Sequence, residues 1–210
     1  MIELLVVMVI MFILLALSAP FVTSLQSDIA IRKTVRQVKT DLITNIGYSL
    51  AGKSITALSA DDLTNPELLP SHYALYFKTY DEYGNYSPYS YIEMRVGESN
   101  GSDKIAKKLY QIEKEIPSSV VSLKEIRIDG VSSKTVDSAY IVFTPPFGKV
   151  YLVSGSAHES FAEGESDLNL TDAFEESQNN TKIELDFQYK DDEHTLATIT
   201  FSTDKIINIL

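Results

Sequence analysis

The chain has 210 residues, enough for one ordinary domain and an anchor, and its hydrophobic content of 44% is that of a folded protein. Its formal net charge is −11, and it contains no cysteine, which excludes a disulfide framework and a thiolate metal site. Residues 1–60 carry three acids and five bases (net +2), whereas residues 61–210 carry 26 acids and 13 bases (net −13). So acidic a C-terminal part disfavours nucleic acid as a partner, because phosphate binding needs clustered lysine and arginine.

The N-terminal segment is apolar over a membrane-spanning length. From Met1 to Leu17 the only charged or polar residue is Glu3, and the run extends to Leu25 with few interruptions. About 20 apolar residues are needed to cross a bilayer. A cleaved secretory signal is the alternative, but such signals carry a basic N-terminal region and a shorter apolar core. The pattern therefore predicts a permanent single-pass anchor.

The charges around this segment conflict with its expected orientation. Arg32, Lys33, Arg36 and Lys39 follow the apolar run, and no lysine or arginine precedes it. The positive-inside rule would then place the C-terminal side in the cytoplasm, whereas the β-rich remainder has the pattern of an extracytoplasmic domain. We expect a basic leader upstream of Met1 to resolve the conflict.

The segment Ile2-Glu-Leu-Leu-Val-Val7 resembles the N-terminus of type IV pilins and of type II secretion pseudopilins. In that family a proline follows the glutamate after seventeen residues, and Glu3 and Pro20 have this spacing. The resemblance covers residues 2–50. It implies a short basic leader whose cleavage site is not present in this chain, with Met1 standing where the family has leucine. It also implies a prepilin peptidase and methylase, an assembly platform and other pilin or pseudopilin subunits as partners.

The resemblance gives Glu3 and Pro20 assembly roles. In the family reading, Glu3 pairs with the N-terminal amine of a neighbouring subunit inside a filament core, where pairing offsets the cost of burying each ion. Alternatively, Glu3 stays hydrated at the edge of the bilayer. Pro20 removes an amide donor, so we expect a kink or a locally melted stretch there, or else a helix end at the membrane surface.

Three regions follow from the pattern: a transmembrane or filament-core helix over 1–25, an amphipathic stalk helix over 26–52, and a β-rich head over 53–210. The helix is expected to continue to about residues 48–51. Its predicted apolar stripe has spacings of mostly three and four; the members are Val22, Leu25, Ile29, Val35, Val38, Leu42, Ile46 and Leu50. The bases at 32–39 form either a solvated face or a contact with a neighbour's acidic head.

Beyond residue 71 the apolar period changes to two, which predicts strands. The expected hairpins pair 73–80 with 89–96, 109–116 with 120–128, and 139–144 with 149–154, and a meander covers 182–189, 195–201 and 205–210. The predicted fold class is α+β, a long N-terminal helix packed on an antiparallel β-sheet head. This order also resembles the minor pseudopilin group of the GspH/FimT type, through Tyr73–Phe77 and Ile141–Val150.

Candidate chemistry is sparse. Glu163, Glu165 and Asp167 lie in an acidic segment that could supply oxygen ligands to calcium. The order of residues in calcium-binding loops is absent, however, so we expect a solvated acidic loop and no cofactor. The three histidines are scattered, and no nucleotide-binding or nucleophile motif is present, so we expect no enzyme. A tyrosine-rich stretch, Tyr73 to Tyr91, serves either cross-strand packing or a surface contact.

The expected function is a structural subunit of a type IV pilus-like filament or of a type II secretion pseudopilus, anchored in the membrane before assembly. The expected location is the bacterial inner or cytoplasmic membrane, with the head outside the cytoplasm and the assembled filament in the periplasm or at the cell surface. The alternative is a filament-tip binding module, an adhesin or a DNA-uptake minor pilin, that uses the head as a receptor.

Overall fold

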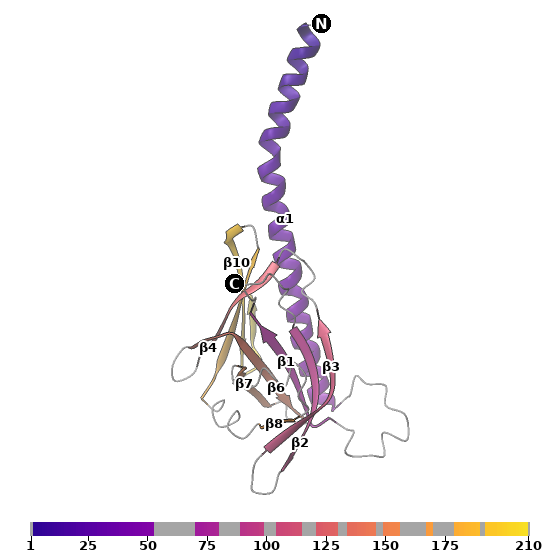
Figure 1. Cartoon of the computed structure of the whole chain (residues 1–210), viewed down its shortest axis with the longest axis vertical. Helices are drawn as coiled ribbons and strands as arrows, with labels where there is room; N and C mark the ends of the chain where they lie inside the picture. Colours follow the sequence, from indigo (N-terminus) through magenta and orange to yellow (C-terminus); the bar gives the residue numbers. More distant parts are fainter. Residues whose placement is uncertain are drawn as a thin grey trace, which may run out of the picture.

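A computed structural model describes residues 2–52, 70–79, 89–98, 104–114, 121–129, 134–145, 149–155, 167–169, 179–189 and 192–209. One helix, α1 (Ile2–Ala51), occupies the N-terminal quarter and projects far beyond a β-rich head (Figure 1). Gly52 follows the helix with a φ of +59°, the left-handed conformation that commonly ends a helix after its last residue. The predicted helix end at residues 48–51 is confirmed.

Eleven strands are assigned within the described residues, and all of their pairings are antiparallel. Sheet A has the order β7-β6-β1-β2-β3-β8 and sheet B the order β11-β10-β9-β4-β5. The strands of sheet A are β1 (His72–Lys78), β2 (Tyr89–Glu98), β3 (Lys104–Lys114), β6 (Ser138–Thr144), β7 (Lys149–Ser154) and β8 (Asp167–Asn169). Those of sheet B are β4 (Val121–Asp129), β5 (Lys134–Val136), β9 (Lys182–Tyr189), β10 (Asp192–Ser202) and β11 (Ile207–Ile209).

The expected α+β fold, a long helix packed on antiparallel sheet, is confirmed. The β1–β2 and β6–β7 hairpins and the β9–β10–β11 meander pair as predicted. The predicted hairpin between residues 109–116 and 120–128 is wrong, because β3 pairs with β2 and β8 in sheet A, whereas β4 pairs with β9 and β5 in sheet B. Alternation of apolar and polar residues identifies a strand. It does not identify the neighbouring strand, because pairing depends on how the apolar faces of all the strands pack together in the core.

The main core lies where both sheets meet the lower half of α1. The helix contacts β1 and β6 of sheet A and β4, β9 and β10 of sheet B. Leu42 of α1, Phe143 of β6 and Phe201 of β10 are fully buried in one cluster, with the two phenyl rings edge to face at 6.0 Å. The helix is therefore a structural layer of the head, and its removal would expose both sheets.

Sheet A carries a second apolar cluster on its other face. Along β1, Tyr73, Leu75 and Phe77 point into the main core, whereas Ala74 and Tyr76 belong to the second cluster. Burial on both faces explains why β1 is a continuous apolar run instead of an alternating one. Sheet B differs, since β9 alternates buried with half-buried residues and so has one polar face.

Candidate assembly surface on the N-terminal helix

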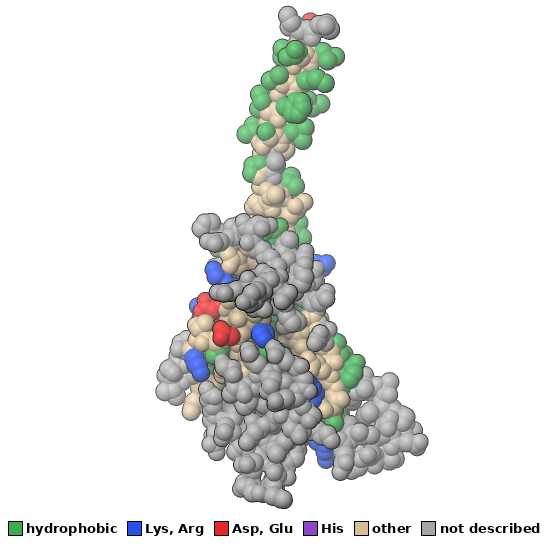
Figure 2. All heavy atoms as spheres, in the orientation of Figure 1, with side chains coloured by type: hydrophobic (Ala, Val, Ile, Leu, Met, Phe, Trp, Pro, Cys, Tyr) green, Lys and Arg blue, Asp and Glu red, His purple; other side chains and the backbone are tan. Residues whose placement is uncertain are grey.

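The upper half of α1 projects from the head with its side chains exposed. Every side chain described between Glu3 and Gln26 is exposed, and burial begins at Ser27. Leu4, Phe12 and Leu17, for example, are each about 70% exposed. In Figure 2, hydrophobic side chains cover most of the upper part of this half, whereas tan atoms predominate just above the head. An apolar helix of this length is stable only when lipid or other protein surrounds it.

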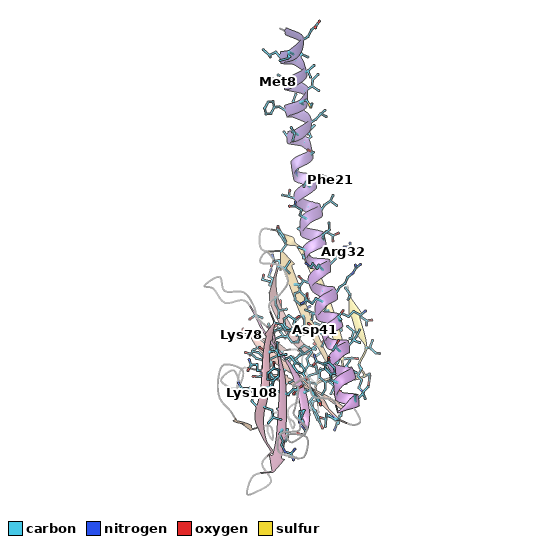
Figure 3. The ribbon with its side chains drawn as sticks, turned by 90° about the vertical axis from the view of Figure 1, so that its right-hand side faces the viewer. Met8, Phe21, Arg32, Asp41, Lys78 and Lys108 are labelled. Atoms are coloured by element: carbon cyan, nitrogen blue, oxygen red, sulfur yellow. The ribbon has the colours of Figure 1, made fainter. Side chains whose placement is uncertain are left out.

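Within the described residues, α1 is the one helix long and apolar enough to cross a membrane. Burial along α1 begins between residues 26 and 27, and the division into an anchor over 1–25 and a stalk over 26–52 stays a prediction. Figure 3 shows Met8 and Phe21 on the protruding part and Asp41 beside the sheets. The helix is thus exposed and apolar where a span is predicted, and packed where a stalk is predicted.

Helical structure continues through Pro20, so the predicted local melting is not found. A proline at this position leaves the carbonyl of Ala16 without its usual amide donor. Two hydroxyl groups donate to carbonyls nearby: Ser18 Oγ lies 2.9 Å from the Leu15 oxygen, and Thr23 Oγ1 lies 3.0 Å from the Pro20 oxygen. Serine and threonine side chains are among the groups that allow proline within membrane helices.

Glu3 lies in the first turn of α1 with its side chain exposed. A carboxylate there interacts favourably with the positive end of the helix dipole, by about 0.3–1 kcal/mol at an exposed site. It stands at the far tip of the protruding half, remote from the head, so any charged partner has to come from outside this chain's head. Pro20 is exposed on the same half, between the tip and the point where burial begins.

The lower half of α1 is seated in the head by one buried face. Ile31, Val35, Val38 and Leu42 are buried in the main core, and Ile46 packs partly against it. The predicted stripe is correct at Val35, Val38 and Leu42. It is wrong at Leu50, which is exposed, because the packing face has a different centre from the one inferred from apolar residues alone. Val22, Leu25 and Ile29 precede the part of the stripe that was expected to pack on the head, and they are exposed. Three polar side chains, Thr34, Asn45 and Ser49, lie within the buried face.

Polar contacts around Asp41 fix the helix against sheet A. The Lys114 ammonium on β3 lies 2.7 Å from Asp41 Oδ1, and the Tyr89 hydroxyl on β2 donates to Asp41 Oδ2 at 2.5 Å. The Gln37 amide, one turn earlier, donates to the Tyr89 hydroxyl at 3.5 Å. Burial, reinforced by the hydrogen bond to Asp41, raises the pKa of Tyr89. Helix register against the sheet is therefore set by directed contacts as well as by apolar packing.

A fully buried carboxylate, Glu93, lies further along β2. It accepts a hydrogen bond of 3.0 Å from the Tyr91 hydroxyl, and the chain register shifts between Glu93 and Met94. Burial raises the pKa of Tyr91, and Glu93 raises it further. Burial also raises the pKa of Tyr73, whose ring stacks on Tyr91, to about 12. The Tyr73 hydroxyl is buried without a hydrogen-bond partner among the described residues.

The remaining predicted site residues fall in different places. Glu163 and Glu165 lie outside the described residues, and Asp167 begins β8, where its backbone pairs with Lys107. No group of three metal-ligating side chains occurs in the described part of the chain. Of the tyrosine-rich stretch, the described aromatic residues are buried, which confirms packing for them: Tyr73, Tyr76, Phe77, Tyr89 and Tyr91. Tyr80, Tyr83 and Tyr86 lie outside the described residues.

Sequence reasoning missed both polar contacts. Asp41 could have been singled out as an acid in a helix whose neighbouring charges, at 32–39, are basic. Glu93 occupies the same alternate positions as Tyr89 and Tyr91, so an inward-facing acid could have been inferred from the period of two. The partners of Asp41 come from two strands far along the chain, β2 and β3, and could not have been inferred from the sequence.

In comparisons with known proteins, no family model, no curated protein and no solved structure matches the chain. The structure therefore defines the protein by its architecture: a β-rich head is built around the lower half of one helix, and the upper half of that helix is apolar and exposed.

Proposed function

We propose that this chain is a structural subunit that is held in a membrane by the upper half of α1 and assembles with other subunits through the same segment, as in type IV pilus-like filaments or type II secretion pseudopili. The observation that carries the proposal is the continuity of α1. Its exposed apolar half and its buried half form one helix, with no linker between anchor and head.

A protein that is only tethered to a membrane does not require its anchor and its head to share one continuous helix. A tethered domain works on a flexible linker, whereas here the anchor and part of the head's main core are the same helix. Packing of upper halves side by side would therefore set the spacing and orientation of the heads. The resemblance of Ile2–Val7 and the spacing of Glu3 to Pro20 support a filament over an isolated anchor.

Glu3 gives the proposed assembly its register. A carboxylate in an apolar, water-poor bundle costs several kcal/mol unless it is paired. Pairing with the N-terminal amine of a neighbouring subunit would offset this cost at one axial offset between subunits and at no other. In the dispersed membrane form, the same carboxylate would lie at the hydrated edge of the bilayer. The head, facing away from the cytoplasm, would then form the outer surface of the filament.

Cysteine cross-linking in the membrane tests the proposal, because the natural chain contains no cysteine. Single cysteines placed in turn at Val6, Val9 and Ile13 of the full-length chain should form disulfide-linked dimers in the membrane of a host that carries the assembly machinery. We expect an extended ladder of products when two cysteines are combined in one chain. Uniformly monomeric chains at every position would refute assembly through α1 while leaving the anchor intact.

A further inference from the structure

We propose that three bases on the stalk, Arg32, Lys33 and Arg36, form a binding surface for anionic phospholipid headgroups in the leaflet that faces the head. We call these residues the basic collar. The inference rests on the membrane span of the proposed function and does not depend on filament assembly. All three side chains are exposed, on the side of α1 opposite the residues buried in the main core.

Two of the three collar bases, Lys33 and Arg36, carry charge that the acids of the stalk do not pair with. Residues 26–52 contain four bases and two acids, Asp28 and Asp41. Asp28 pairs with Arg32 at 2.9 Å, and Asp41 is occupied by Lys114 of β3. Within the described residues, Lys33 and Arg36 have no carboxylate partner. Arg127 on the head differs, since it contacts Glu184 and Asp186 at 2.9 Å each.

The height of the collar matches the lipid headgroup layer. Arg32 follows Leu25, the last residue of the apolar run, by seven residues, which is about 10 Å along the axis at 1.5 Å per residue. Side chains on a helix tilt toward its N-terminus, here toward the membrane. Arg32 shows this direction, since its guanidinium reaches back one turn to Asp28 (Figure 3). Long basic side chains can therefore extend from the stalk into the headgroup layer.

Charge favours lipid over a second copy of this chain as the occupant. Three of the four acids described on the polar face of sheet B are already in ion pairs: Asp129 with Lys182, and Glu184 and Asp186 with Arg127. The fourth, Glu125, accepts a hydrogen bond from the Thr135 hydroxyl. A neighbouring head would thus have to break existing ion pairs to bind the collar through this face. Anionic lipid phosphates need only exchange mobile counterions. The collar would also separate the acidic part of the chain, net −13 over residues 61–210, from a negatively charged bilayer that repels it.

Energy transfer to labelled lipids tests the assignment. The full-length chain with Ser24→Cys carries a donor fluorophore in phosphatidylcholine bilayers that contain trace acceptor-labelled phosphatidylglycerol or phosphatidylcholine. We expect stronger transfer to the labelled phosphatidylglycerol, and a loss of this preference as salt is raised. In the R32Q/K33Q/R36Q variant, the apparent affinity for phosphatidylglycerol should fall by about fivefold for each base removed.

The matched control is K124Q/K134Q/K149Q, which removes the same charge from exposed positions of the head. It should keep the preference for phosphatidylglycerol. Equal transfer to both lipids in the unchanged chain, or equal loss in the two variants, would overturn the lipid assignment. It would also be overturned if the collar variant lost only self-association, since that result would identify a second copy as the occupant. Failure of the unchanged chain to enter bilayers would instead refute the anchor itself.

Discussion

The Lys114 ammonium of β3 lies 2.7 Å from the Asp41 carboxylate of α1, seventy-three residues earlier in the chain. Both side chains are largely shielded from water, and Asp41 also receives the Tyr89 hydroxyl. One carboxylate thus ties the stalk to two neighbouring strands of sheet A. The contact fixes which way the helix faces in the head, and it can be removed without changing the exposed surface of the upper half.

Replacing Asp41 by Asn should lower the free energy of unfolding by about 1–3 kcal/mol, because Lys114 loses its counter-charge in a partly buried site. Thermal unfolding of the detergent-solubilised chain, followed by near-ultraviolet circular dichroism, measures the effect. Asp28→Asn is the matched control, since it breaks the exposed pair with Arg32 and should cost no more than about 0.5 kcal/mol. Equal effects would show that the Asp41 contact does not fix the helix.

Replacing Glu3 by Ala should leave the head folded and abolish incorporation into filaments when no unchanged copy is present. Head folding is checked by circular dichroism, and incorporation by recovery of the chain in sheared or secreted filament fractions. Glu3→Asp should retain part of the incorporation because it keeps the charge, and Ser24→Ala should retain all of it. Normal assembly of the Ala variant would refute a role for Glu3 in register.

A shortened chain that begins at Ile29 should be soluble and monomeric, because the side chains from Glu3 to Gln26 contribute exposed apolar surface and little to the main core. Size-exclusion chromatography with light scattering gives its mass in solution. A second shortened chain that begins at Thr44 would lack Val35, Val38 and Leu42, and it should fail to fold. Fibres formed by the Ile29 chain would place the assembly element in the head.

Replacing Tyr73 by Phe should leave stability unchanged or raise the free energy of unfolding by up to about 1 kcal/mol, because a buried hydroxyl without a described partner is removed. Replacing Tyr91 by Phe should lower it by about 1–2 kcal/mol, because the hydrogen bond to the buried Glu93 carboxylate is lost. Each substitution removes one hydroxyl group, and the two rings stack on each other. Each variant is therefore the control for the other when their free energies of unfolding are compared.

Alkaline pH should destabilise the head through its buried tyrosines. The pKa of Tyr73 is raised from 10.0 to about 12 by burial, with Glu93 adding to the shift. The folded chain therefore keeps a proton that the unfolded chain releases, so this contribution to stability is complete below pH 10 and declines between pH 10 and about 12. Tyrosinate absorbance should rise in two steps, exposed residues first and the buried group only with unfolding. A single step near pH 10 without unfolding would contradict this account.

Much of the head was predictable from the sequence because alternation reports burial directly. The strands at 73–77, 139–144, 149–154 and 182–189 were found where their inward residues alternate with outward ones or where both faces are apolar. Pairing was predictable only across short turns. The separation of β3 from β4 into different sheets was missed, because proline and serine between two strands favour a turn without specifying whether the strands meet.

For α1, the exposed apolar side chains of the upper half were predictable from the sequence, whereas the set of buried residues in the lower half was predictable only in part. Exposure of an apolar run needs no knowledge of the rest of the fold, and the boundary near residue 25 followed from composition alone. Burial of Thr34, Asn45 and Ser49 was not predictable, because each side chain donates locally to a carbonyl three or four residues earlier, although the Asn45 Oδ1 has no partner among the described residues. A polar residue that bonds its own helix can be buried at little cost, and a count of apolar positions cannot detect it.

The continuity of α1 makes the subunit a rigid lever. Fifty helical residues span about 75 Å at 1.5 Å per residue, and no hinge separates the end that contacts lipid or neighbours from the end that is embedded in two sheets. A tilt of about 10° at the upper half would swing the far end of such a rod by about 13 Å. If the upper half is held in a membrane and packs with other subunits as proposed, a displacement at that end would therefore move the head with it, because the helix is unbroken from one end to the other.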